Sequence, residues 1–100
     1  MDELEWKLLS LTAKRGVIGA TREDCFRGIR GLRYEDLEDA MRRLEAEGFI
    51  QVEWTGPNKF ILTVTEKGSK LAAAEYEKRL KSYEDRIEAQ RRAVGGVERI

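Results

Sequence analysis

The sequence predicts a mainly helical α+β fold, in which three helices precede a small β-hairpin and a long helix follows it. Three observations predict this order. Apolar residues recur at helical spacing over residues 37–44, ahead of Gly48, which suits the left-handed end of a helix. Two alternating segments then flank the turn residues 56–58. Finally, no Pro interrupts the helical pattern over residues 66–93.

A first helix is expected to begin at Asp2, whose carboxylate can cap it, and to extend to about Lys14. Gly16 follows at the position where the helix should close. The short apolar stretch Val17-Ile18 is expected to form an edge strand.

A second helix is expected to open at Thr21, because an acidic residue, Asp24, follows it three positions later as in a capping box. Gly31 should end this helix, with Cys25, Phe26 and Ile29 forming its buried face. About three residues then connect it to a third helix, residues 34–47, and so tight a connection around a Gly is typical of a helix-turn-helix.

The third helix is expected to bury Tyr34, Leu37, Met41 and Leu44. Strands over residues 49–54 and 60–65 should complete the hairpin. Trp54 and Phe60 flank the turn and are expected to pair across it. If they are exposed, they instead offer a surface for a partner or a platform for stacked bases. Residues 1–66 are therefore predicted to form one domain.

The last helix, from Glu66 to Ala93, should be roughly 42 Å long at 1.5 Å per residue. A compact domain of this size has a radius of gyration of only about 13 Å, so the helix must project from the body. Apolar residues alternate by three and four along it, which is the pattern of a coiled-coil seam. We expect residues 67–94 to dimerise with a second copy through Ala73, Tyr76, Leu80, Tyr83, Ile87 and Val94.

The predicted helix ends at Gly95-Gly96, and residues 95–100 are expected to form a flexible tail. The seam also contains Tyr76 and Tyr83, whose bulk either packs simply or opens a small cavity between the two helices.

The run from Leu37 to Leu71, with its helix, glycine stop, hairpin and Thr-capped helix, resembles the back half of a winged helix-turn-helix domain. The PadR-like and MarR-like regulators are examples, and the resemblance covers residues 2 to about 71. The chain also resembles small archaeal winged-helix chromatin proteins that dimerise through a C-terminal coiled coil. The resemblance implies a homodimer that binds duplex DNA in transcription regulation or chromatin organisation. In the PadR-like and MarR-like regulators, effectors bind near the junction with the dimerisation helix.

Guanidinium groups suit phosphates, and an arginine recurs every three residues at the end of the second helix. The third helix and the hairpin turn contribute further candidates. The full set of predicted DNA contacts is Arg22, Arg27, Arg30, Arg33, Arg42, Arg43, Asn58 and Lys59. The alternative for the arginines is a solvated surface that pairs with neighbouring acids.

The net charge of zero is distributed unevenly: residues 1–34 carry +2, residues 35–66 carry −5 and residues 67–100 carry +3. Duplex-binding domains usually present a basic face, yet the acidic block includes the third helix and the hairpin. Helix-dipole effects account locally for acids at the start of this helix. The alternative function is therefore a protein-interaction module that docks its acidic third helix on a basic partner.

Catalysis is not expected, because His is absent and no serine has a neighbouring base. No metal site or cofactor is expected either, since Cys25 is the only cysteine and is interpreted as a buried thiol. The absence of a secretory segment or long apolar run predicts a cytoplasmic protein with no membrane span. Charged residues make up 38% of the chain, a balance typical of heat-adapted proteins.

Overall fold

The computed structural model describes the backbone of residues 1–98 and the side chains of residues 1–92. Within this part, the chain is mainly helical with a small three-stranded antiparallel sheet, which confirms the predicted α+β class. The order of the elements is compatible with a winged-helix layout. Among the described helices, none has an apolar stretch long enough to cross a membrane.

Helix α1 (Glu3–Arg15) begins and ends as predicted. The Oδ1 atom of Asp2 accepts a hydrogen bond from the backbone N–H of Glu5 at 2.7 Å, and Gly16 closes the helix with a positive φ. The predicted strand at Val17-Ile18 is wrong. Those two residues belong to a 3-10 turn (Gly16–Ile18), closed by a 3.2 Å hydrogen bond from Gly19 N–H to Gly16 C=O, and their side chains are 99% and 73% exposed.

The edge strand instead comes two residues later, as β1 (Ala20–Thr21). Burial explains the shift, because Ala20 is fully buried whereas the more apolar pair before it points to solvent. Helix α2 (Arg22–Gly28) then opens with the predicted capping box between Thr21 and Asp24. The helix ends earlier than Gly31, because Ile29 turns to extended backbone while its side chain remains in the core.

This capping box predicts a pH dependence of folding. The backbone N–H of Thr21 donates to the Asp24 carboxylate at 3.0 Å and lowers its pKa below the ordinary 3.8. A lowered folded-state pKa stabilises the fold above the unfolded value, and this stabilisation disappears as the pH falls through the folded one. We expect Asp24→Asn to flatten the dependence of the urea-unfolding free energy on pH below about 4. An unchanged pH dependence would contradict this role of the carboxylate.

Helix α3 (Tyr34–Ala46) packs its apolar stripe into the core beside α1. At its end, Gly48 adopts a φ of +79°, which residues with a side chain rarely tolerate. Phe49 N–H donates to Leu44 C=O at 2.9 Å across this turn, so the predicted glycine stop is confirmed. The buried core joins this stripe to α1, the sheet and the first turns of the last helix, through Leu8, Leu9, Ala20, Cys25, Ile29, Leu37, Ala40, Met41, Leu44, Ile50, Phe60, Leu62 and Ala72.

The hairpin consists of β2 (Ile50–Gly56) and β3 (Lys59–Val64), close to the predicted ranges. The strand order β1-β3-β2 places β3 in the middle and leaves the outer edge of β2 unpaired among the described residues. A register shift between Trp54 and Gly56 marks a bulge just before the turn. Trp54 and Phe60 pair across the hairpin as predicted, with ring centroids 5.4 Å apart and an edge-on angle of 71°.

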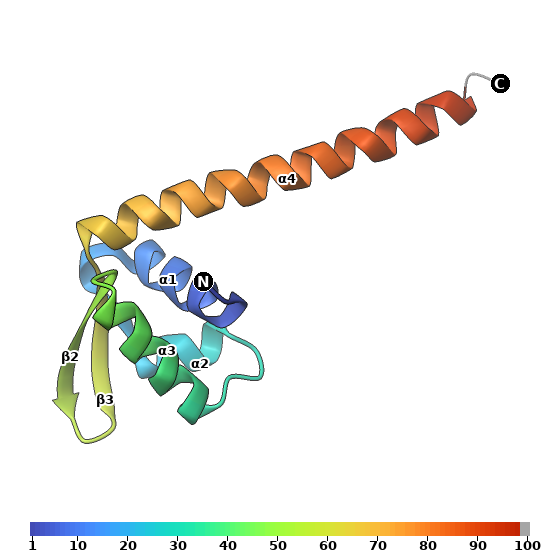
Figure 1. Ribbon diagram of the computed structural model, residues 1–100. Helices are drawn as coiled ribbons and strands as arrows, with labels where there is room; N and C mark the ends of the chain where they lie inside the picture. Colours follow the sequence, from blue (N-terminus) through green and yellow to red (C-terminus); the bar gives the residue numbers. More distant parts are fainter. Residues whose placement is uncertain (99–100) are drawn as a thin grey trace.

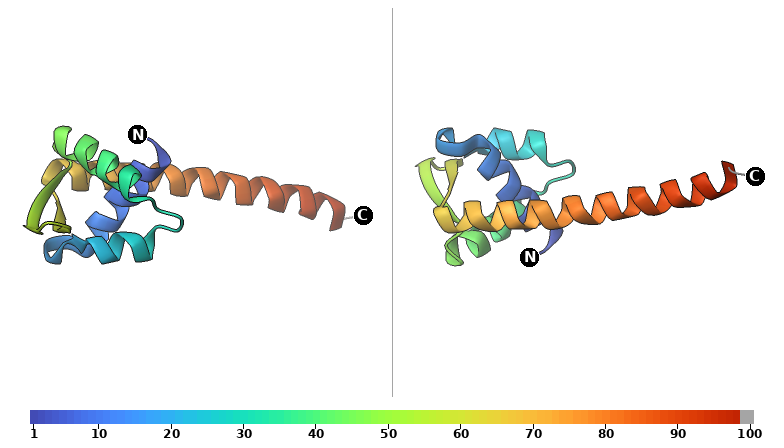
Figure 2. Two further views of the ribbon diagram at one scale, coloured as in Figure 1. Left: turned by 90° about the horizontal axis from the view of Figure 1, so that it is seen from below. Right: turned by 90° about the horizontal axis from the view of Figure 1, so that it is seen from above.

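Helix α4 (Glu66–Glu98) starts at a Thr cap, as predicted: Thr65 Oγ1 accepts from Gly68 N–H at 3.0 Å. It runs through Gly95 and Gly96, so the predicted end of the helix there is wrong, and residues 99–100 of the predicted tail lie outside the described residues. The helix extends far beyond the body (Figures 1 and 2), giving extents of 65 × 28 × 21 Å and a radius of gyration of 17.6 Å. The predicted projection is confirmed.

Arg79 holds α4 against α1 at the point where α4 begins to project from the body. The Arg79 guanidinium lies 4.7 Å above the Trp6 ring on α1, and its nitrogens are 3.3 Å from the Glu3 carboxylate and 3.1 Å from that of Glu75. These contacts tie the fourth turn of α4 to α1, and the helix leaves the body beyond them (Figure 1).

Candidate nucleic-acid interface

The segments that carry most of the predicted contact residues lie on one side of the molecule. The N-terminal end of α3 and the turn between β2 and β3 are both on the side turned away from α4 (Figure 1). The connection between α2 and α3 leads directly into this end of α3 and extends beyond the ends of both helices (Figure 2). The connection between α2 and α3 and the hairpin turn therefore bracket α3.

Three of the predicted arginines lie in or beside the connection between α2 and α3. Arg27 is in the last turn of α2, Arg30 is in the connection and Arg33 occupies the N-cap position of α3. All three side chains are exposed. Arg33 lies 3.7 Å from the Glu35 carboxylate, whereas Arg27 and Arg30 form no ion pair with a described side chain. This stretch is thus a basic segment open to an anionic ligand.

Arg22 is placed differently. Its guanidinium carbon lies 5.1 Å from the centre of the Phe26 ring and 5.5 Å from that of Tyr34, so the side chain bridges α2 and α3 as a cation–π contact. Its Nε atom is buried and has no hydrogen-bond partner among the described residues. The structure therefore gives Arg22 a packing contact between the two helices.

The two arginines of α3 both contact acids of the same chain. Arg42 pairs with Glu38 one turn earlier. Arg43 reaches α1, where its Nε lies 3.0 Å from the Glu5 carboxylate and its Nη2 lies 3.5 Å from that of Asp2. Arg43 hence joins α3 to α1, and Arg42 is the arginine of α3 that lies beside the hairpin.

The exposed surface of α3 is acidic. The helix contains two arginines, already paired, against five acids: Glu35, Asp36, Glu38, Asp39 and Glu45. Carboxylates repel phosphates, and in a major groove they are accommodated only where they accept a hydrogen bond from a base such as cytosine. This surface does not by itself favour the approach of DNA.

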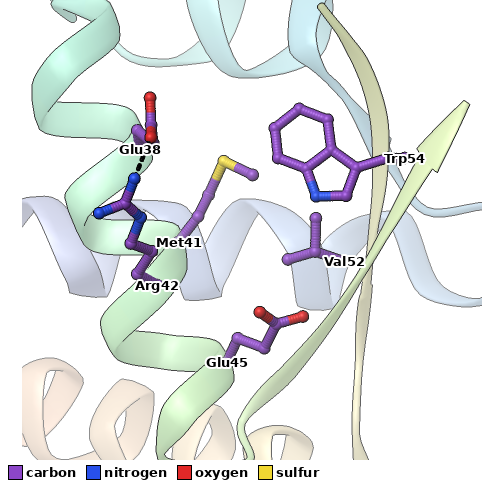
Figure 3. A pocket seen from close by; sticks show the side chains of 6 residues that line it. All are labelled: Glu38, Met41, Arg42, Glu45, Val52 and Trp54. Atoms are coloured by element: carbon purple, nitrogen blue, oxygen red, sulfur yellow. Dashed lines mark hydrogen bonds and ion pairs between the residues drawn. The ribbon is translucent and has the colours of Figure 1, made fainter. Parts of the chain in front are cut away.

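A groove separates α3 from β2 (Figure 3). It contains a hollow of about 220 Å³ whose lining residues point toward one another from the helix and the strand: Glu38, Met41, Arg42, Glu45, Val52 and Trp54. The Trp54 side chain is 53% exposed despite its contact with Phe60. Both roles that the sequence suggested for Trp54, pairing across the hairpin and presenting a surface, are therefore compatible with its position.

Asn58 and Lys59, the predicted contacts of the hairpin turn, are both exposed at its tip. The hairpin turn lies away from the basic connection between α2 and α3, on the other side of α3 in Figure 1. The structure thus places Arg27, Arg30 and Arg33 at one end of a face and Asn58 and Lys59 at the other, with the acidic α3 between them.

The predicted dimer seam forms an exposed apolar stripe on α4. Tyr76, Leu80 and Tyr83 are 57%, 42% and 56% exposed. Ala73 is also exposed and Ile87 is half-buried, while the side chain of Val94 lies outside the described residues. Large apolar side chains at this spacing on a projecting helix are typical of a surface that a partner covers.

Cys25 is fully buried, and this burial raises the pKa of its thiol to about 12. A thiol with so high a pKa stays protonated and is a poor nucleophile or metal ligand. In the described part of the chain, no group of three or more His, Cys, Asp or Glu side chains is arranged to hold a metal ion.

Comparisons with protein-family models, with curated proteins and with solved structures found no match. The class of the protein is therefore defined by its fold: a mainly helical α+β chain with a small antiparallel sheet, compatible with a winged-helix layout, and a long projecting helix.

Proposed function

We propose that the chain is a winged helix-turn-helix protein that binds duplex DNA as a homodimer, in transcription regulation or chromatin organisation. The observation that carries the proposal is the exposed basic segment of Arg27, Arg30 and Arg33, placed next to the N-terminal end of α3. Helix-turn-helix proteins present this end of the third helix to the duplex, and arginines beside it reach phosphates.

The acidic surface of α3 restricts the mode of binding. Arg42 and Arg43 are paired within the chain. The predicted cations that remain for DNA are Arg27 and Arg30, the exposed Arg33, whose contact with Glu35 a phosphate would have to displace, and Lys59 at the hairpin turn. The affinity would therefore come from phosphate contacts at the two ends of the face. Such binding is tolerant of sequence and strongly dependent on salt.

The homodimer is part of the proposal because one such face offers few cations. Two copies joined along α4 would double the number of phosphate contacts and hold the two faces at a fixed separation. The exposed stripe of Tyr76, Leu80 and Tyr83 supports this arrangement.

Binding to a labelled duplex of about 30 base pairs, roughly three helical turns, tests the proposal by fluorescence anisotropy over a salt series. We expect replacement of Arg27, Arg30 and Arg33 by Ala to weaken binding by on the order of tenfold or more at low salt. The slope of log affinity against log salt should become shallower by about 0.9 for each phosphate that the variant no longer neutralises.

Replacement of Lys78, Lys81 and Arg92 by Ala provides a matched control, because it removes the same charge from the exposed surface of α4. This control should bind DNA nearly as well as the unmodified chain. Equal decreases in affinity for both variants, or no binding by the unmodified chain at low salt, would refute the assignment.

A further inference from the structure

The groove between α3 and β2 combines an apolar base with free space. Met41 is buried at its base, Val52 is half-buried, and the Trp54 ring is 53% exposed at one end (Figure 3). An exposed tryptophan beside a concave apolar surface is typical of a binding site for a partner.

The elongated extent of the groove favours a polypeptide ligand. The hollow beside Trp54 is about 220 Å³, smaller than the sites of about 300–1,000 Å³ that usually enclose a drug-sized ligand. A second hollow of about 550 Å³ shares Glu45 and Val52 with it and continues around the first half of β2. Because Thr63 of β3 and Thr65 also line the second hollow, the concave surface extends along β2 and part of β3, as an elongated ligand requires.

The charge of the groove indicates the chemistry of that polypeptide. Glu38 and Glu45 line the first hollow, and Glu45 and Glu53 line the second. Arg42 is the one cation among the lining residues described, and its guanidinium is paired with Glu38. A basic segment complements this arrangement, whereas a phosphate backbone is repelled by it.

We propose that this groove binds a basic polypeptide segment, which inserts one apolar side chain between Met41 and Trp54. Lysine or arginine side chains of the segment pair with Glu38 and Glu45 on either side of that anchor. The site uses none of Arg27, Arg30, Arg33 or Lys59. Peptide binding in the groove therefore goes beyond the proposed DNA binding and is tested independently of it.

Selection from a library of short random peptides displayed on phage, with the full-length protein as bait, tests this inference. We expect the enriched peptides to carry several lysines or arginines around an apolar residue. Labelled copies of them should bind the Glu38→Gln, Glu45→Gln double variant about tenfold more weakly, since two charge pairs are removed. The matched control Glu77→Gln, Glu84→Gln removes the same charge from α4 and should bind like the unmodified chain.

The fluorescence of Trp54 supplies a second readout, in which Trp54 itself is not replaced. In a Trp6→Phe variant, Trp54 is the remaining tryptophan, and binding of the enriched peptides should shift its fluorescence to shorter wavelength. Neutral or acidic enriched peptides, no enrichment at all, equal binding to both double variants, or an unchanged Trp54 spectrum would each overturn the inference.

Arg42→Gln separates this inference from DNA binding. The substitution removes the cation that pairs with Glu38, so we expect affinity for the basic peptides to rise severalfold and affinity for duplex DNA to fall or stay the same. A weaker affinity for the peptides would contradict the groove site. The Arg27, Arg30 and Arg33 triple variant should leave peptide binding unchanged whether or not the chain binds DNA.

Discussion

A chain carrying Leu80→Asp and Ile87→Asp is expected to be a monomer in solution, whereas the unmodified chain should have twice the 11.5 kDa mass of one copy. Both residues belong to the apolar stripe of α4, and Leu80 is 42% exposed in the single chain. Burial of a leucine or isoleucine side chain contributes about 1.5–3 kcal/mol, and in a two-fold dimer each substitution removes it twice. A buried aspartate adds the further cost of an unpaired charge.

The projecting part of α4 gives this prediction a second readout. Beyond Arg79 the helix is separated from the body, and in proteins most helical stability comes from packing of an apolar face rather than from intrinsic propensity. Loss of the partner should therefore also lower the helical circular dichroism of the variant. The body should remain folded, because its core lies outside the projecting part.

The matched control is Ser82→Asp with Ala89→Asp, which adds the same two charges two positions after each seam residue, on exposed positions of α4. Light scattering should give this control the mass of the unmodified chain. If the seam variant keeps that mass, or if the unmodified chain is already a monomer, α4 does not dimerise through this stripe.

Local signals in the sequence predicted much of the fold because they act over a few residues. Asp2 and Thr21 cap helices, and Gly48 takes the positive φ that a side chain would hinder. The strand predicted at Val17-Ile18 is wrong because two local signals compete there. The apolar character of the pair favours a strand, but the flanking glycines close a 3-10 turn that directs both side chains to solvent.

The candidate site depended on contacts between distant residues, which no local pattern shows. The sequence grouped Arg22 and Arg43 with the other predicted DNA contacts, yet Arg22 lies against two aromatic rings and Arg43 pairs with acids some 40 positions away. The groove was missed as well, because Met41 and Trp54 come together only when α3 packs beside β2. The acidic block was visible in the sequence, but the hollow that it borders was not.

Gly68 is the site of the second large effect, because it lies where the start of α4 crosses the residue that precedes β2. A Cβ atom at this position would be 1.9 Å from the carbonyl oxygen of Phe49 and 3.0 Å from the Val64 side chain. The carbonyl is backbone and accepts a hydrogen bond from Thr65 N–H at 3.1 Å, so it cannot turn away freely. Nearby, Thr65 Oγ1 donates to Gly48 C=O at 2.6 Å and completes the junction.

We therefore expect Gly68→Ala to destabilise the fold by about 1–3 kcal/mol or more, the usual cost of overpacking. In an open helical position the same change stabilises by about 0.5–1 kcal/mol, so the sign of the effect tests the contact. Urea unfolding at matched protein concentration measures it, with Ser69→Ala as a control at the next, exposed position. We expect the control to change the unfolding free energy by only a few tenths of a kcal/mol. Both changes introduce alanine into the same helical turn, so a large destabilisation for Gly68→Ala alone would be due to the contact with Phe49. A gain in stability for both would mean that α4 does not approach Phe49 so closely.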